Sequence, residues 1–154
     1  YVTNAVKHSF DFFGAVTSSD NYTLQYNADG TLAQQSVSNT NGTQTTIYEY
    51  TDGNRSSGKL FVGATETEKY IFSHSNVVNK TGIDDNNGVY TPYFGKPSHN
   101  LIDSLQVIAG TDTSVAIYTH TLDNNDYVIK TIRTYVKPSI ESRYFTYTYF
   151  DCGE

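Results

Sequence analysis

Aromatic and polar residues alternate along short stretches of this chain, and each stretch runs into a turn rich in Asp, Asn and Gly. Tyr22 to Tyr26 places its aromatic and aliphatic residues at every second position, before Asp29 and Gly30. The same phrase recurs in the ranges 48–54, 118–126 and 147–153. Period-2 alternation followed by a tight polar turn is typical of a half-buried strand in a β-hairpin. The pattern therefore predicts a series of antiparallel hairpins.

Extending this interpretation along the chain gives a meander of short strands. We expect strands near residues 5–13, 22–27, 31–38, 43–51, 59–65, 68–78, 114–122, 127–135 and 143–150. Short strands separated by Gly, Asn and Asp at intervals of about 8 to 12 residues indicate an antiparallel β-protein. The predicted fold class is all-β, with an antiparallel hairpin meander forming a curved sheet, either a half-barrel or a sandwich.

A long segment from Asn79 to Asn100 interrupts the meander. It contains Pro92 and Pro97, and proline cannot donate a hydrogen bond to a sheet ladder. We therefore expect this Pro- and Asn-rich segment to be a loop that covers one end or one open face of the sheet.

The residues after this loop allow two interpretations. Leu101, Ile102, Leu105 and Ile108 fit the spacing of an apolar helix face, with Ser98 as a possible N-cap, so a short helix over 100–107 is one prediction. Alternation of Leu105 and Val107 favours a strand instead.

Composition limits the classes of partner. The 154 residues suit a single domain spanning 1–154. The ten Lys and Arg are scattered and outnumbered by 16 Asp and Glu, for a net charge of −6, so we expect no binding to nucleic acid. No apolar run approaches the roughly 18 residues of a membrane helix, so we expect no transmembrane segment.

Abundant Thr, Ser, Asn and Tyr with few charged residues is typical of β-proteins outside the cytoplasm, and it predicts an extracytoplasmic location, in the cell envelope or secreted. The chain begins at Tyr1 and contains no Met, which suggests a removed leader or a trimmed sequence.

The hairpin phrases resemble two known groups. The stretch Tyr22 to Leu32 is similar to the tyrosine–aspartate hairpin repeat of bacterial shell proteins. The layout of 22–32, 48–54, 90–101 and 118–149, about half the chain, resembles the lipoprotein domains of unknown function that are abundant in Bacteroides-type gut bacteria. This resemblance implies an envelope protein with an antiparallel sheet and supplies no catalytic residues. The lipidated cysteine expected at a mature N-terminus is absent, so any lipid anchor would precede Tyr1.

The sequence contains histidines, a cysteine and carboxylates, but not at the spacings typical of metal sites or catalytic sites. The four histidines lack any paired metal-ligand spacing, and the single cysteine lies near the C-terminus, so we expect no metal site and no cofactor. The runs 84–88 and 123–126 are rich in oxygen but lack the full ligand spacing of a calcium loop, so they are interpreted as Asn/Asp turns. Glu66 and Glu68 would share one face of a regular strand, which does not supply two carboxylates facing each other across a cleft. No catalytic residue is predicted.

Three functions remain. We expect first a non-catalytic extracytoplasmic binding or scaffold module, whose partner is a glycan, a peptide or an envelope protein. The alternative is a carrier that holds an apolar ligand in a half-barrel; it predicts a concave face of aliphatic residues and Phe, whereas a glycan site predicts exposed Tyr beside Asn and Asp. A glycan hydrolase is the third. The candidate ligand-binding residues lie where the hairpin pattern breaks, namely Tyr90, Tyr93, Phe94 and His99.

Overall fold

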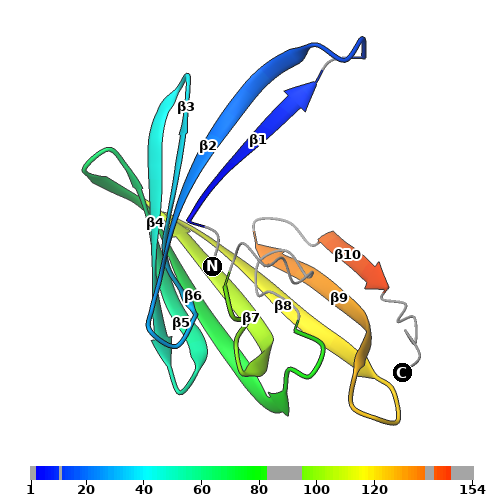
Figure 1. The fold of residues 1–154 in the computed structure, drawn as a ribbon. Coiled ribbons are helices and arrows are strands. Elements are labelled where there is room, and N and C mark those ends of the chain that lie inside the picture. Colours follow the sequence, from blue (N-terminus) through cyan, green and yellow to red (C-terminus); the bar gives the residue numbers. More distant parts are fainter. Residues whose placement is uncertain (1–2, 11, 83–94, 138–140, 147–154) are drawn as a thin grey trace.

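The described part of the chain folds into ten β-strands. The computed structural model describes residues 3–10, 12–82, 95–137 and 141–146. The strands are β1 (Asn4–Phe10), β2 (Val16–Tyr26), β3 (Leu32–Asn39), β4 (Gly42–Thr51), β5 (Asn54–Val62), β6 (Thr65–Val78), β7 (Asn100–Ala109), β8 (Asp112–Leu122), β9 (Val128–Lys137) and β10 (Glu141–Thr146). Each strand pairs antiparallel with the next, so the order in the sheet is the order in the chain (Figure 1).

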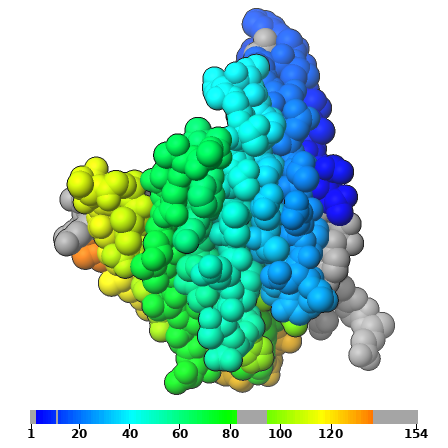
Figure 2. Space-filling model, turned by 90° about the vertical axis from the view of Figure 1, so that its left-hand side faces the viewer, coloured from blue at the N-terminus to red at the C-terminus, as the bar shows by residue number. Residues whose placement is uncertain are grey.

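The predicted all-β antiparallel meander is therefore confirmed. The described strands form one sheet rather than the two packed sheets of a sandwich, and β1 and β10 are its two edges. The sheet twists strongly, so that β1 and β2 run in a direction visibly different from β8 and β9 (Figure 1). Figure 2 shows one surface of this sheet, where the blue β1–β2 hairpin, the cyan β3–β4 hairpin and the green β5–β6 hairpin follow one another.

The predicted Asp-Gly turn between β4 and β5 has the positive φ angles that Asp and Gly tolerate. Thr51 pairs with Asn54 across a two-residue turn in which Asp52 and Gly53 both have positive φ, 51° and 76°. Positive φ at both central positions is the type I′ turn, whose twist matches that of the flanking strands. The Asp-Gly motif identified in the sequence thus forms a tight hairpin turn that fixes the register of the two strands it joins.

Two longer turns repeat one hydrogen-bond pattern. In 27–31 the Asn27 amide donates to the Thr31 carbonyl, and in 123–127 the Asp123 amide donates to the Tyr127 carbonyl. The Asp123 carboxylate accepts the amides of Asn125 and Tyr127, which is the geometry of an Asx turn. The 123–126 run is therefore a turn, as interpreted; the 84–88 run lies outside the described residues.

The predicted helix over 100–107 is wrong, and the strand alternative holds. These residues lie in β7, which pairs with β6 on one side and β8 on the other. Ser104 pairs with Ser73 and Ile102 with His74, so Asp103 is an extra residue in the ladder. This β-bulge breaks the period-2 pattern, so that Ile102 lies on the same face as Leu105, three residues away. The resulting spacing imitates one face of a helix.

The last described residues of the long loop, 95–99, form what we call the end strap. The Lys96 amide donates to the Gly30 carbonyl in the β2–β3 turn, and the His99 amide donates to the Gly53 carbonyl in the β4–β5 turn. The buried Ser98 hydroxyl accepts the Arg55 amide at 3.0 Å. The end strap therefore lies across one end of the sheet, as we expected for part of this loop.

The first residues of the same β6–β7 connection contact the β8–β9 turn and the start of β9, at the same end of the sheet. Lys80 Nζ lies 2.9 Å from Asp126 Oδ2 and 3.1 Å from the Asn125 carbonyl. The Thr81 hydroxyl accepts the Val128 amide. The connection between β6 and β7 thus contacts the turns on both sides of it and fixes this end of the sheet.

The buried core lies along one face of the sheet. Its apolar members among the described residues are Leu24, Leu32, Phe72, Leu101, Ile102, Ala116 and Val128, all at most 6% exposed. The part of the chain described by the structure contains no helix with the length and hydropathy to cross a membrane.

Candidate functional site

One face of the sheet carries a row of tyrosines. Cross-strand partners lie on the same face, and the register places Tyr48 beside Gly58, Gly58 beside Tyr70 and Tyr118 beside Arg133. Followed strand by strand, the register assigns seven half-buried tyrosines to this face, which we call the tyrosine face: Tyr22, Tyr26, Tyr48, Tyr50, Tyr70, Tyr118 and Tyr135. These rings keep part of their surface in contact with solvent, which a ligand could cover.

A buried arginine organises the β4–β6 part of the tyrosine face. Arg55 is 2% exposed, and its guanidinium carbon lies 4.4 Å from the centre of the Tyr48 ring and 5.7 Å from that of Phe72. Its Nε donates to the Tyr50 hydroxyl at 3.3 Å, and that hydroxyl donates to the Leu32 carbonyl. A cation over an aromatic face contributes about 2 kcal/mol when it is removed from water. Arg55 therefore holds the rings around it in place.

A glycine lets two tyrosine rings lie against the sheet. A Cβ atom at Gly58 would lie 3.1 Å from Tyr48 Cδ1 and 3.2 Å from Tyr70 Cδ2. Both rings thus cover the backbone where Gly58 has no side chain, an arrangement that stabilises glycine in a strand. The outer surfaces of Tyr48 and Tyr70 form an aromatic platform in the middle of the sheet.

Tyr70 makes a short hydrogen bond to a carboxylate on its own strand. Its hydroxyl donates to Glu68 Oε2 at 2.5 Å. Burial raises the pKa of the Tyr70 hydroxyl well above its ordinary value of 10.0, and the hydrogen bond and the negative charge of Glu68 raise that pKa further. At neutral pH the Tyr70 hydroxyl is therefore protonated and acts as the donor in this hydrogen bond.

We expect Tyr70 to ionise at a higher pH than an ordinary tyrosine when tyrosinate absorbance is followed. Because folding raises this pKa, the stability that Tyr70 contributes is present below pH 10 and is lost as the pH rises through its folded-state pKa. Tyr70→Phe removes the late step, and Glu68→Gln, which keeps an acceptor without the charge, moves it to lower pH. An unchanged titration curve in Tyr70→Phe would contradict the assignment.

A second aromatic cluster lies on β8 and β9. The Arg133 guanidinium is 5.0 Å from the centre of the Tyr135 ring, and the Tyr118 and His120 rings stack at 6.5 Å with 17° between their planes. His120 Nε2 lies 2.8 Å from the Ile102 carbonyl, which only accepts, so this nitrogen carries the proton. The imidazole is therefore fixed in orientation, and the tyrosine face carries an aromatic and cationic cluster on either side of β7.

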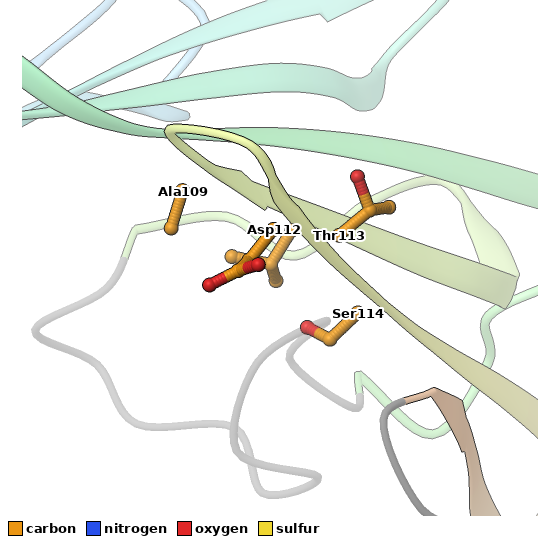
Figure 3. Close-up of a pocket in the computed structure, with 5 residues that line it drawn as sticks. Ala109, Asp112, Thr113 and Ser114 are labelled. Carbon is orange, nitrogen blue, oxygen red and sulfur yellow. The ribbon is translucent and has the colours of Figure 1, made fainter.

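A hollow of about 290 Å³ opens where β7 and β8 meet their connecting turn. It is lined by Val107, Ala109, Asp112, Thr113 and Ser114. Figure 3 shows Ala109, Asp112 and Ser114 pointing to one side of the hairpin and Thr113 to the other. A second hollow, of about 270 Å³, borders the same turn and is lined by Glu66, Thr67, Glu68, Lys69, Ile108 and Gly110, of which Lys69 and Ile108 pair on the face opposite the tyrosine face. At this end of the tyrosine face, the Asp112 carboxylate and the Ser114 hydroxyl thus lie beside the small apolar side chains of Val107 and Ala109.

The sequence-predicted ligand residues lie elsewhere or outside the described part. Tyr90, Tyr93 and Phe94 are outside the described residues. His99 is exposed and belongs to the end strap, where its Cβ lies 3.4 Å from the Cβ position of Gly53. The β4–β5 turn that it contacts is at the opposite end of the sheet from the β7–β8 turn. The structure therefore does not bring His99 to the hollows.

Glu66 and Glu68, expected on one face of a regular strand, point to opposite faces. Glu66 pairs with Phe61 and Glu68 pairs with Leu60, which leaves Thr67 as the extra residue of a β-bulge. The Thr67 hydroxyl donates to the Leu60 carbonyl, and Glu66 faces Lys59 at 4.0 Å on the other side. Of the two carboxylates, only Glu68 contributes to the tyrosine face.

Comparisons with known proteins add a distant structural likeness. No family model and no curated protein matches the chain. Among solved structures, the chain is similar to a porin-like protein from Bacteroides uniformis ATCC 8492, with 13% sequence identity and a TM-score of 0.44, over 92% of this chain and 88% of that one. At this identity and TM-score the likeness carries no argument about function.

Proposed function

We propose that this protein is a non-catalytic extracytoplasmic binding module whose ligand lies on the tyrosine face. The observation that carries the proposal is the gathering of seven half-buried tyrosines on one side of a single sheet. Aromatic faces stack on the C–H groups of sugars, and Tyr hydroxyls form hydrogen bonds at the rim of the same contact. A glycan is therefore the favoured ligand, ahead of a peptide or an envelope protein.

The chemistry of the tyrosine face supports a glycan over an apolar ligand. A carrier requires a concave surface of aliphatic residues and Phe, whereas the half-buried rings here belong to tyrosines and lie beside Arg133, His120 and Glu68. Phe72 lies under Arg55 and is only 6% exposed, so it offers little surface to a ligand. Polar groups beside aromatic rings suit hydroxyl-rich molecules.

The location rests on composition and on the resemblance to envelope lipoprotein domains. A surface rich in Thr, Ser, Asn and Tyr favours a place outside the cytoplasm, in the envelope or secreted, with a lipid anchor upstream of Tyr1 in the envelope case. Cell fractionation of the native protein tests this part. Recovery in the cytoplasmic fraction would contradict it.

A binding panel tests the function. We expect the protein to bind one class of immobilised glycan above background, with a dissociation constant in the micromolar to millimolar range that is ordinary for an open, shallow site. Soluble oligosaccharides of the bound class are then incubated with the protein and assayed for new reducing ends. The absence of any glycan binding contradicts the glycan proposal, and the release of reducing ends contradicts a non-catalytic role.

A further inference from the structure

Two rows of side chains on the tyrosine face form a trough across β6, β7 and β8. Tyr70, Val107 and Ser114 are cross-strand neighbours in the first row. In the second row Ala109 pairs with Asp112, and Glu68 occupies the corresponding place on β6, two residues from Tyr70. We call this arrangement the trough: its floor is Val107 and Ala109, one wall is Glu68, held by the Tyr70 hydroxyl, and the other wall is Ser114 and Asp112.

The dimensions of the trough suit one sugar ring. Neighbouring strands are about 4.8 Å apart, so β6 and β8 lie roughly 10 Å apart on either side of β7. The floor side chains are small and apolar, and the hollow above Ala109, Asp112 and Ser114 holds about 290 Å³. A pyranose ring placed between the walls would rest its C–H face on the floor, and its equatorial hydroxyls would point toward the walls.

The walls have the chemistry to hold those hydroxyls. A carboxylate has two oxygens that accept hydrogen bonds, and bonds to a charged group are among the stronger ones in proteins. Glu68 is already oriented by the Tyr70 hydroxyl, which donates to one of its oxygens. In Figure 3, Asp112 and Ser114 point to the same side of their hairpin as Ala109. Acceptors therefore flank an apolar floor on both sides.

We infer that the trough is a subsite for a neutral hexose or pentose unit of a glycan, with Glu68 and Asp112 accepting hydrogen bonds from sugar hydroxyls and Val107 and Ala109 beneath the ring. This inference rests on the proposed function and names the ligand class and its place. The two carboxylates make the trough unfavourable for acidic sugars, because a uronate would bring a third negative charge between them.

Isothermal titration with two matched series of soluble oligosaccharides tests the trough. One series is neutral, with glucose, mannose, galactose or xylose units, and the other consists of oligogalacturonates. We expect the wild-type protein to bind a member of the neutral series and to bind the oligogalacturonates at least tenfold more weakly. Asp112→Asn should weaken binding by about tenfold, because one accepting oxygen becomes a donating NH2 group and the remaining hydrogen bond loses its charge assistance.

Two further variants show whether a loss of binding comes from a change in the trough or from a loss of folded structure. Ala109→Phe fills the floor with a ring and should abolish binding, while Asp103→Asn makes the same charge change as Asp112→Asn at an exposed position on β7 outside the trough and should bind like the wild type. Far-ultraviolet circular dichroism and the thermal midpoint confirm that each variant is folded.

The outcomes distinguish the two proposals. If the wild-type protein binds a neutral oligosaccharide and both Asp112→Asn and Ala109→Phe bind it equally well, the trough is not the subsite, although the proposed function stands. Tighter binding of oligogalacturonates than of neutral sugars overturns the inference in the same way. If no saccharide of either series binds, the proposed function and the inference both fail.

Discussion

Replacement of Gly95 by alanine is expected to lower the free energy of unfolding by about 3 kcal/mol or more, since it combines backbone strain with overpacking. Gly95 has φ of +74°, a conformation that costs a residue with a Cβ about 1–2 kcal/mol. A Cβ there would also lie 2.8 Å from the Gly30 carbonyl oxygen and 2.9 Å from the Leu32 nitrogen. Both atoms belong to backbone and cannot rotate away.

A matched glycine separates the two causes. Gly110 also has positive φ, +59°, but a Cβ there meets nothing within 4 Å, so Gly110→Ala should cost only about 1–2 kcal/mol. Denaturant unfolding gives both values. Amide exchange locates the effect, because the amide of Lys96, which donates to the Gly30 carbonyl, should lose protection in Gly95→Ala and keep it in Gly110→Ala. Equal losses of stability in the two variants would show that the end strap does not pack as described.

The second large effect is expected at Leu32. This side chain is 0% exposed at the start of β3, and the backbone carbonyl of Leu32 accepts the Tyr50 hydroxyl. Truncation of a fully buried leucine costs about 2–5 kcal/mol, because the apolar contact is lost and a cavity remains. We therefore expect Leu32→Ala to lower the free energy of unfolding by that amount in denaturant titrations, with an unchanged m value.

Val62→Ala is the control for this truncation. Val62 lies at the end of β5 with 46% of its surface exposed, and substitution at such a position changes stability by about 0.5 kcal/mol or less. If Leu32→Ala were as mild as Val62→Ala, the core would not lie on the face that we describe.

The meander was predictable from sequence because each hairpin is specified locally. Turn residues with positive φ, such as Asp52 and Gly53, stand between alternating strands and fix their register. The errors share one physical cause. A β-bulge adds one residue to a strand, and the pattern of hydrophobic residues does not reveal where. Every side chain beyond the bulge then lies on the face opposite to the one that a regular alternation predicts.

Three positions illustrate this cause. The bulge at Asp103 made β7 resemble a helix, and the bulge at Thr67 separated Glu66 from Glu68. In β9, a regular period-2 alternation would place Val128 on the face opposite Thr131. The register shift between Thr121 and Leu122 leaves Ile129 unpaired, and Val128 and Thr131 are both buried, at 1% and 2% exposure.

The candidate site was less predictable than the fold. The tyrosines were visible in the sequence as alternating rings, but nothing near Arg55 or Gly58 marked this stretch as the place where they meet. The trough joins Tyr70, Val107 and Ser114, which are distant in sequence and become neighbours only through the register of β6, β7 and β8. The expectation that function lies in the 79–100 segment, at Tyr90, Tyr93, Phe94 and His99, stays a prediction.

The most direct test of a ligand on the tyrosine face is a nuclear magnetic resonance titration of uniformly labelled protein with the tightest-binding oligosaccharide. We predict that the largest shift changes fall on the ring signals of Tyr48 and Tyr70 and on the side chains of Val107, Asp112 and Ser114. Residues on the opposite face, such as Thr45 and Ile117, should change little. Shift changes concentrated on that opposite face, with the tyrosine rings unaffected, would contradict the account.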